Sequence, residues 1–298
     1  MKLFELIGNT PLVELGHIPS RPEVKIYCKL EGQNPGGSVK DRAAFFMIKE
    51  ALRRGDIKKG DKLVEATSGN TGIALAMMAQ LLGVKMTLIM PDNSTPERVV
   101  SMEAYGAEVI LTPAERTIEY SRELAEEMAE TKGYFMLNQF GNSDNLMSHY
   151  HTTGPEIWRD TKGEITHFVS AMGTTGTIMG VSSYLKEQNP AVQIVGTQPT
   201  DGSNIPGIRR WSPEFLPKIF DPKKVDQVID VSEGDASAMT RRMAKEEGIL
   251  AGMSSGGALF AAIKIAETIE SGLIVCIACD RGDRYLSSDL FKKGSIES

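Results

Sequence analysis

The stretch Asn34-Pro-Gly-Gly-Ser-Val-Lys-Asp-Arg42 places one lysine at the beginning of an expected helix. Pro35 and the two glycines after it form a turn that continues neither a helix nor a strand, and Ser38 with Asp41 is typical of a helix N-terminus. Lys40 is therefore expected in the first helical turn, where the helix dipole disfavours its positive charge. This favours a neutral nucleophile that forms a Schiff base. The alternative is a surface lysine between flexible glycines.

Outward from this stretch, strand-length apolar runs alternate with segments of helical periodicity. Such alternation predicts an α/β fold with a mostly parallel sheet covered by helices. Strands are expected at residues 24–30, 62–66, 84–90, 108–112, 134–137, 165–170, 193–198, 227–231 and 273–279. Helices are expected at 41–54, 71–82, 96–105, 115–131, 177–187, 235–247 and 256–269.

The 298 residues suffice for about two domains of ordinary size. The polar loop 138–145 is the best candidate for a break between them. Residues 199–224 form one long irregular stretch with five prolines, which cannot be a regular helix. Because long loops in compact enzymes tend to be functional, this stretch is expected near a site.

Composition excludes several classes of function. A net charge of -6 argues against a nucleic-acid partner or an anionic membrane surface, since both require a basic patch. No apolar stretch approaches the ~18 residues of a membrane span, and we expect a cytoplasmic protein. Cys276 and Cys279 have CxxC spacing, but in an expected strand they point to opposite faces, which favours core packing and no metal site.

Three loops lie between an expected strand and a helix, where α/β proteins place ligands. The first is Thr-Ser-Gly-Asn-Thr-Gly at 67–72. Its backbone N–H groups and hydroxyls could hold a carboxylate at the helix dipole. The alternative is a plain helix cap formed by Ser68 or Asn70.

The second loop is Gly-Thr-Thr-Gly-Thr at 173–177, called here the glycine-threonine loop. Its glycines let the backbone approach an anion and its hydroxyls add donors, so it is a candidate phosphate site. It has neither the lysine of a Walker P-loop nor the GxGxxG pattern, which favours the single phosphate of a small cofactor. A helix cap without a ligand is the alternative.

The third loop, Gly-Met-Ser-Ser-Gly at 252–256, fits the GxSxG pattern of a hydrolase nucleophile. That fold requires a histidine later in the chain than the serine, and the last histidine here is His167. The hydrolase interpretation therefore fails. Ser254 remains either a serine at a helix start facing a ligand or a simple cap.

The lysine stretch and these three loops, in this order, resemble the fold-type II pyridoxal-phosphate enzymes, and within them the cysteine synthases (O-acetylserine sulfhydrylases). The resemblance runs from Ile-Gly-Asn-Thr-Pro-Leu at 7–12 to Arg-Tyr-Leu at 284–286. Segments 90–92, 149–158, 206–211 and 279–283 resemble the B isozymes. The resemblance to the family implies a tryptophan synthase β-like fold of two open, twisted sheets. It also implies a smaller mobile domain at 38–143 and a larger cofactor-binding domain of 1–37 and 144–298.

The resemblance also implies roles for individual residues. Lys40 would hold pyridoxal 5'-phosphate as a Schiff base, Asn70 would bind the 3-hydroxyl of its ring, and Ser254 would meet its pyridine nitrogen. The phosphate would be bound by Gly173, Thr174, Thr175, Gly176 and Thr177. The substrate carboxylate would be bound by Thr67, Ser68, Thr71 and Gln139. A homodimer is implied as well.

The implied reaction is a β-replacement on O-acetyl-L-serine. Lys40 would remove the α-proton, acetate would leave, and sulfide or thiosulfate would attack an aminoacrylate intermediate to give L-cysteine or S-sulfocysteine. Arg209 and Arg210 in the irregular stretch are expected to select an anionic sulfur donor, Arg210 ahead of Arg209. The alternative is that they pair with a carboxylate such as Asp201 or Glu214.

Three other functions stay open at this point. O-phosphoserine could replace O-acetylserine as the substrate. A cystathionine β-synthase or a serine or threonine dehydratase would use the same lysine and phosphate loop. A catalytically silent pyridoxal-phosphate-binding scaffold is the alternative from another class, although Lys40, Asn70 and Ser254 are all present.

Overall fold

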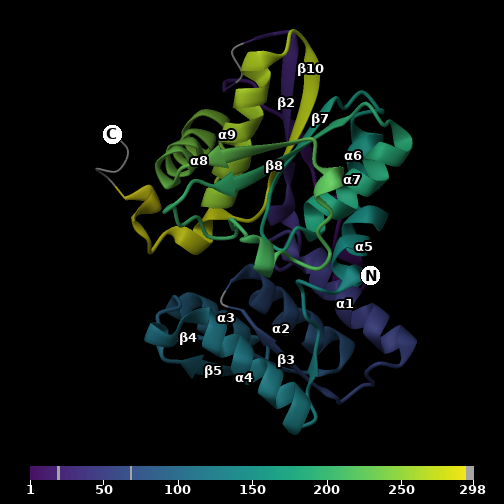
Figure 1. Ribbon diagram of the computed structural model, residues 1–298, viewed down its shortest axis with the longest axis vertical. Coiled ribbons are helices and arrows are strands. Elements are labelled where there is room, and N and C mark those ends of the chain that lie inside the picture. Colours follow the sequence, from purple (N-terminus) through teal and green to yellow (C-terminus); the bar gives the residue numbers. More distant parts are fainter. Residues whose placement is uncertain (19–20, 68, 293–298) are drawn as a thin grey trace. The chain divides into compact units, whose positions relative to one another are not determined.

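The computed structural model describes residues 1–18, 21–67 and 69–292. The chain divides into two compact units, the first made of Met1–Ile7 and Lys40–Asn145 and the second of Gly8–Val39 and Leu146–Ser298. Each unit has its own sheet with helices on both faces (Figure 1). Within the described residues, no helix is long and apolar enough to span a membrane.

The first unit has a four-stranded parallel sheet in the order β5-β4-β3-β6. One face of the sheet, to which Leu63 of β3 points, packs against buried side chains from α1, α2 and α3. The other face, to which Val64 of β3 points, packs against α4. Neighbouring residues of one strand thus serve two cores, as the pleat requires. Its elements are α1 (Lys40–Arg54), β3 (Lys62–Ala66), α2 (Asn70–Leu82), β4 (Lys85–Pro91), α3 (Pro96–Ala104), β5 (Glu108–Thr112), α4 (Thr117–Thr131) and β6 (Phe135–Met136), with 3₁₀ helices at Leu3–Leu6 and Ala114–Arg116.

Met1–Ile7 groups with this unit, whereas the sequence-based division put residues 1–37 with the larger one. The reason is packing. Phe4 and Ile7 contact the core around α1 and α2, and the Phe4 ring stacks on Phe45 with centroids 5.4 Å apart.

The second unit has a six-stranded sheet in the order β1-β2-β10-β7-β8-β9, in which only the pair β1 and β2 is antiparallel. In Figure 1, α8 and α9 lie on one face and α6 and α7 on the other. Its elements are β1 (Leu12–Glu14), β2 (Val24–Leu30), α6 (Thr153–Asp160), β7 (His167–Ala171), α7 (Gly176–Gln188), β8 (Gln193–Pro199), β9 (Gln227–Val231), α8 (Glu233–Glu247), α9 (Met253–Thr268) and β10 (Gly272–Ala278). Helix α5 (Ser143–His151) contains the boundary between the units, and 3₁₀ helices lie at Glu31–Gln33, Pro213–Phe215, Pro222–Lys224, Gly282–Tyr285 and Asp289–Phe291.

Strand β10 shows why apolar runs form this sheet. Ile274 packs toward α8 and α9, and Val275 packs toward α6 and α7. A strand buried on both faces has no polar alternation, which confirms the predicted α/β class. Cys276 is fully buried with its sulfur 3.6 Å from that of Cys28, while Cys279 follows the strand.

The expected strands and helices all exist, with ends displaced by up to three residues. Apart from the 3₁₀ helices, three elements of the described residues were not expected, namely β1, α5 and α6. Strand β1 has only three residues, and α6 carries Pro155 in its first turn, where proline is compatible with a helix but weakens its signal in a sequence. Pro199 ends β8, and residues 200–224 are irregular as predicted, apart from two three-residue 3₁₀ turns.

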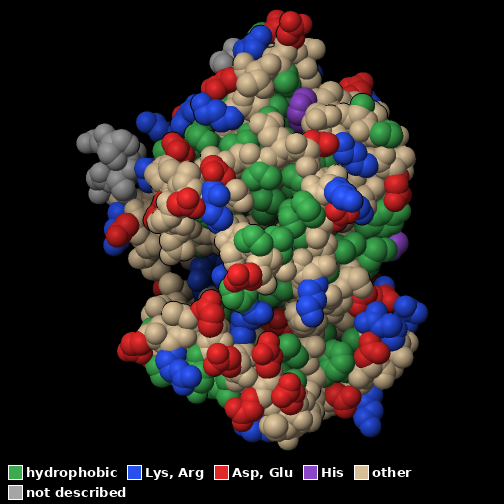
Figure 2. Space-filling model, in the orientation of Figure 1, with side chains coloured by type: hydrophobic (Ala, Val, Ile, Leu, Met, Phe, Trp, Pro, Cys, Tyr) green, Lys and Arg blue, Asp and Glu red, His purple; other side chains and the backbone are tan. Residues whose placement is uncertain are grey.

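The surface has no large region of a single charge on the face shown in Figure 2. Lys and Arg side chains lie among Asp and Glu side chains there, in keeping with a net charge of -6. This face offers no extended basic patch of the kind that binds polyanions.

Candidate functional site

The glycine-threonine loop connects the end of β7 to the beginning of α7 in the second unit. Thr175 is the residue before α7, it has a positive φ of 67°, and its carbonyl accepts a hydrogen bond from Met179 N (2.9 Å). A threonine in this conformation is strained, which is typical of a functional turn. The first N–H groups of a helix have no acceptor within the helix and lie at its positive end, so the loop offers donors to an anion.

The backbone of this loop lies directly against the proline-rich stretch. A Cβ on Gly173 would lie 2.6 Å from the carbonyl oxygen of Gly207. Trp211 Nε1 donates to the Gly173 carbonyl (2.9 Å), and Arg209 N donates to the Met172 carbonyl (2.9 Å). Gly173 is therefore required for close approach of two backbones.

Ser254 is the second residue of α9 and is buried. Gly207, with a φ of +88°, lies against it, since a Cβ there would be 3.6 Å from both Ser254 Cβ and Oγ. The same Gly207 lies against Gly173. The structure therefore brings the glycine-threonine loop and the start of α9 to one place within the second unit.

A buried carboxylate at the end of β10 fixes the beginning of α9. Asp280 Oδ1 accepts a hydrogen bond from Gly252 N (3.2 Å) and its Oδ2 accepts one from the Tyr285 hydroxyl (2.6 Å). Ser255 Oγ accepts a hydrogen bond from Cys279 N (2.9 Å). These contacts hold Ser254 in its position in the first helical turn.

The same end of β10 also binds the residues that precede Lys40. Val39 N donates to the Cys279 carbonyl (2.8 Å), and Ser38 forms a β-bridge with Asp280. Lys40 follows as the first residue of α1 and is half-buried, so it lies in the first helical turn as expected.

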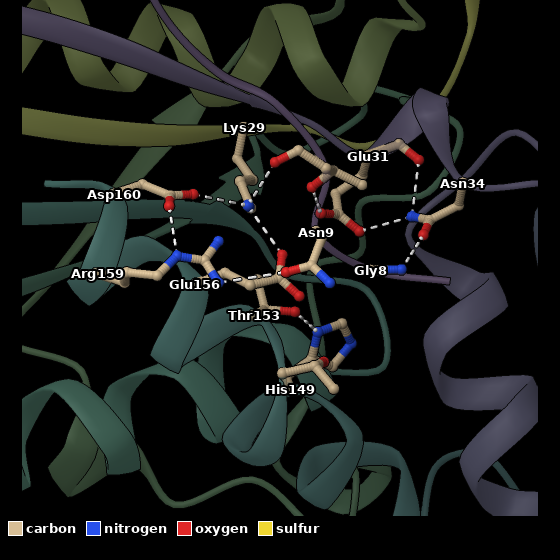
Figure 3. Close-up of polar contacts among 12 residues, drawn as sticks. Gly8, Asn9, Lys29, Glu31, Asn34, His149, Thr153, Glu156, Arg159 and Asp160 are labelled. Carbon is tan, nitrogen blue, oxygen red and sulfur yellow. Dashed lines mark hydrogen bonds and ion pairs between the residues drawn. The ribbon is translucent and has the colours of Figure 1, made fainter. Parts of the chain in front are cut away.

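A buried polar network fixes the other end of the lysine stretch (Figure 3). Asn34 Nδ2 donates to Glu31 Oε2 (2.9 Å), and Asn34 Oδ1 accepts from Gly8 N (2.9 Å). Glu31 Oε1 accepts from the Thr10 hydroxyl (2.7 Å). Thr10 belongs to segment 7–12, where the resemblance to the family begins. That segment therefore supports the lysine stretch through hydrogen bonds to Glu31 and Asn34.

Lys29 belongs to the same network but differs from Lys40. Its fully buried Nζ lies 2.8 Å from Glu156 Oε2 and 3.5 Å from Asp160 Oδ2 and donates to the Thr10 carbonyl (2.7 Å). These ion pairs and this hydrogen bond occupy Nζ, which argues against Lys29 as the nucleophile.

Residues expected to bind the substrate carboxylate lie in the first unit. Thr71 Oγ1 donates to Gln139 Oε1 (3.0 Å), and both side chains are buried. Thr67 follows β3, and Asn70 is the first residue of α2. Ser68 lies outside the described residues. The structure therefore brings Thr71 and Gln139 into contact from distant positions in the sequence.

Glu65 supports this group of residues and was not foreseen. Its carboxylate accepts hydrogen bonds from Asn138 N (3.0 Å) and Gln139 N (3.4 Å). Burial raises the pKa of Glu65 to about 7, although those two N–H groups act in the opposite direction. A single acid inside the buried strand Lys62–Ala66 was the signal that could have revealed it.

Arg209 and Arg210 have different surroundings. Arg210 Nη2 lies 2.5 Å from Asp230 Oδ2, and its Nε lies 3.2 Å from Asp201 Oδ1 and donates to the Pro199 carbonyl. Pairing with Asp201 was the stated alternative, while Asp230 was not foreseen. Hydrogen bonds from Gln198 and Arg210 lower the pKa of Asp230. The exposed Arg209 lies over the Trp211 ring, 5.6 Å from its centroid.

A small cofactor with one phosphate fits the residues of the second unit. The glycine-threonine loop offers backbone donors at a helix N-terminus, and Gly173 leaves no space for a side chain between it and Gly207. Ser254 adds a buried neutral hydroxyl beside Gly207. A hydroxyl suits a ring nitrogen that carries no proton, whereas a carboxylate would stabilise a protonated one.

Comparison with known proteins gives the family. Residues 3–280 match the family described as pyridoxal-phosphate dependent enzyme. The chain is 58% identical over 287 residues to cysteine synthase B of Pseudomonas aeruginosa, covering 96% of each chain. It is 55% identical over 289 residues to cysteine synthase B of Escherichia coli, covering 97% of this chain and 95% of that protein.

Solved structures agree with this result. A cysteine synthase from Entamoeba histolytica matches with a TM-score of 0.92 and 38% identity, covering 99% of this chain and 93% of the other. An O-ureido-L-serine synthase matches with a TM-score of 0.91 and 37% identity, covering 97% and 94%. The chain therefore belongs to the family of pyridoxal-phosphate dependent enzymes, within its group of type B cysteine synthases.

Proposed function

We propose that this protein is a pyridoxal-phosphate-dependent transferase that makes L-cysteine from O-acetyl-L-serine and sulfide. The observation that carries this is the contact of Gly207 with both Gly173 and Ser254, which joins a phosphate site to a neutral hydroxyl at a helix start. In the reaction the bond from the β-carbon to the ester oxygen breaks, acetate leaves with the electron pair, and sulfur forms the new bond. The chain's near relatives are named cysteine synthase B.

Lys40 acts twice in this proposal. Its amine would hold the cofactor covalently, and Nζ, once free, would remove the proton from the substrate's α-carbon. The bound cofactor supplies the electron withdrawal that makes this proton acidic and the β-substituent able to leave. Lys40 is the first residue of α1, and the contacts of Ser38 and Val39 with the end of β10 fix the backbone directly before it.

The remaining residues bind and orient. The glycine-threonine loop would bind the phosphate, Asn70 would bind the ring's 3-hydroxyl, and Ser254 would meet the ring nitrogen. The Ser254 hydroxyl is a neutral partner and would not hold a proton on that nitrogen as a carboxylate would. Gln139, whose Oε1 accepts from the Thr71 hydroxyl, would offer its amide N–H groups to the substrate carboxylate, together with Thr67, Ser68 and the beginning of α2 that contains Thr71.

The test is product analysis with the purified holoenzyme. With O-acetylserine and sulfide we expect equal amounts of cysteine and acetate. With serine alone we expect no pyruvate, and with serine and homocysteine no cystathionine. Pyruvate or cystathionine as the main product would instead assign a dehydratase or a cystathionine β-synthase. Bound cofactor without turnover on any of these substrates would assign a binding scaffold.

We also propose that the protein is a cytoplasmic homodimer. Support comes from the family and from the three cysteines, all of them free, as suits a reducing compartment. Light scattering coupled to size exclusion should give twice the chain mass of 32.5 kDa. A mass of one chain at micromolar concentration would contradict the homodimer.

A further inference from the structure

His149 is a buried histidine of α5 that joins two hydroxyl groups. Its Nδ1 lies 2.8 Å from Thr153 Oγ1, and its Nε2 lies 3.3 Å from Thr177 Oγ1. Figure 3 shows the ring with Nδ1 turned toward Thr153. Only 1% of the residue is exposed. Because Thr177 is the last residue of the glycine-threonine loop, His149 contacts the proposed phosphate site through the Thr177 hydroxyl.

The ring is fixed by close packing of helices. A Cβ on Gly180 of α7 would lie 2.2 Å from the Leu146 carbonyl and 2.7 Å from His149 Cβ, so α5 lies directly on α7. A Cβ on Gly154 of α6 would lie 2.8 Å from Tyr184 Cβ. Small residues thus let α5 and α6 approach α7, and the imidazole cannot leave Thr177 without a shift of these helices.

The direction of each hydrogen bond follows from the phosphate. A phosphate dianion accepts hydrogen bonds, so the Thr177 hydroxyl must donate its hydrogen to it. The oxygen of Thr177 can then accept from Nε2–H of His149. A neutral imidazole has one donor and one acceptor, so Nδ1 carries no hydrogen and accepts from the Thr153 hydroxyl. Such a chain of aligned hydrogen bonds strengthens its last member.

We propose that His149 is a positioning residue of the cofactor site, which holds the Thr177 hydroxyl with its hydrogen directed at the phosphate. The inference rests on the proposed binding of phosphate by the glycine-threonine loop. It assigns to His149 the neutral tautomer with hydrogen on Nε2. It also predicts that the histidine contributes to binding of the phosphate and not to binding of the ring.

The test compares two forms of the cofactor. Apoprotein is titrated with pyridoxal phosphate and with pyridoxal, which lacks the phosphate. Removing the ring nitrogens with His149→Phe should weaken pyridoxal phosphate binding up to about tenfold, the upper end of the worth of a hydrogen bond between neutral groups, and leave pyridoxal binding unchanged. His149→Gln, whose amide can replace Nε2 as a donor, should restore most of the loss.

The matched control is His167→Gln. His167 also contacts a threonine, with Nδ1 2.9 Å from Thr166 Oγ1, but it begins β7 while the glycine-threonine loop follows the end of that strand. The control should leave both affinities unchanged. The ³¹P resonance of the bound cofactor should move in His149→Phe and not in the control, and ¹⁵N spectra of the holoenzyme should show hydrogen on Nε2 of His149.

The outcomes separate the inference from the proposal beneath it. The quantity compared is the affinity for pyridoxal phosphate divided by the affinity for pyridoxal. If Thr177→Val leaves this ratio unchanged, the assignment of the phosphate loop is wrong. If Thr177→Val lowers that ratio and His149→Phe does not, only the role of His149 is wrong. An equal loss for both ligands would mean that His149 merely stabilises the fold. Should His149→Phe fail to fold, the ¹⁵N spectra of the wild-type holoenzyme still decide, since hydrogen on Nδ1 of His149 and none on Nε2 would overturn the inference.

Discussion

Lys29 and Lys40 lie eleven positions apart and show how surroundings assign a role to a side chain. Lys29 is fully buried, and its Nζ forms ion pairs with Glu156 and Asp160. Lys40 is half-buried as the first residue of α1, directly after the turn formed by Pro35 and the two glycines. The sequence distinguishes them through the turn before Lys40.

Replacement of the nucleophile tests this distinction. We expect Lys40→Ala to keep the fold and to lose cysteine formation, because no other amine takes the same position. Borohydride reduction of the wild type followed by peptide mapping should place the cofactor on Lys40. The matched control is Lys49→Ala, on the exposed face of the same helix, which should retain activity. A cofactor fixed to Lys29 or Lys49 would contradict the assignment.

Glu65 gives a prediction about pH. Folding raises its pKa from 4.5 to about 7 through burial, so the folded state favours the neutral acid. An acid shifted in this direction contributes stability below pH 4.5, and that contribution is lost as the pH rises through about 7. Glu65→Gln should remove this pH-dependent loss of unfolding free energy, which amounts to about 3 kcal/mol.

Urea unfolding of the apoprotein at pH 5 and pH 8 measures this effect. The wild type should lose more unfolding free energy between the two than Glu65→Gln does, because every other group contributes equally to both. Part of the gain at pH 8 is offset, since an amide has one acceptor oxygen for the two N–H groups of Asn138 and Gln139. Parallel pH dependence in the two proteins would show that Glu65 does not titrate in this window.

At the scale of elements, the glycine-threonine loop depends on contact between backbones. We expect Gly173→Ala to weaken pyridoxal phosphate binding about ten- to a hundredfold, because its Cβ would lie 2.6 Å from the Gly207 carbonyl and force the two segments apart at 1–3 kcal/mol. Equilibrium dialysis of the apoprotein against the cofactor measures this loss.

Gly234→Ala is the control for that substitution. Gly234 lies in the first turn of α8, where a Cβ would meet only Ser232 Oγ at 3.7 Å. Alanine there should raise stability by up to about 1 kcal/mol and leave cofactor binding unchanged. Unaltered binding in Gly173→Ala would show that the loop can move away from Gly207 without consequence.

The elements also show how far a sequence predicts its structure. Strand β10 could be placed because it is apolar throughout, and α7 because a glycine-rich turn precedes a helical pattern. Helices α5 and α6 were missed because their burial comes from close packing on α7, which no local pattern records. The pairs Glu65 with Gln139 and Arg210 with Asp230 were missed for a related reason, since each joins residues brought together by the sheet.

At the scale of the whole molecule, net charge bears on the choice of sulfur donor. A chain with a net charge of -6 repels an anion such as thiosulfate but not the neutral molecule hydrogen sulfide. Use of thiosulfate therefore requires a local cation. Arg210 pairs with Asp230 and Asp201, which favours a role in holding the proline-rich stretch. Arg209 is an exposed cation whose guanidinium lies over Trp211, so it can be reached from solvent.

We therefore expect the two arginines to differ as alanine variants. Arg209→Ala should lower kcat/KM for thiosulfate about ten- to a hundredfold, the 1.5–3 kcal/mol of a charge-assisted hydrogen bond, and change kcat/KM for sulfide little. Arg210→Ala should lower both values together, because the stretch that contacts Gly173 loses its support. The measurement is the rate of S-sulfocysteine or cysteine formation at saturating O-acetylserine. A selective loss for thiosulfate in Arg210→Ala would return the anion site to Arg210, and a loss seen only with O-phosphoserine as substrate would place these arginines on the side of the leaving group.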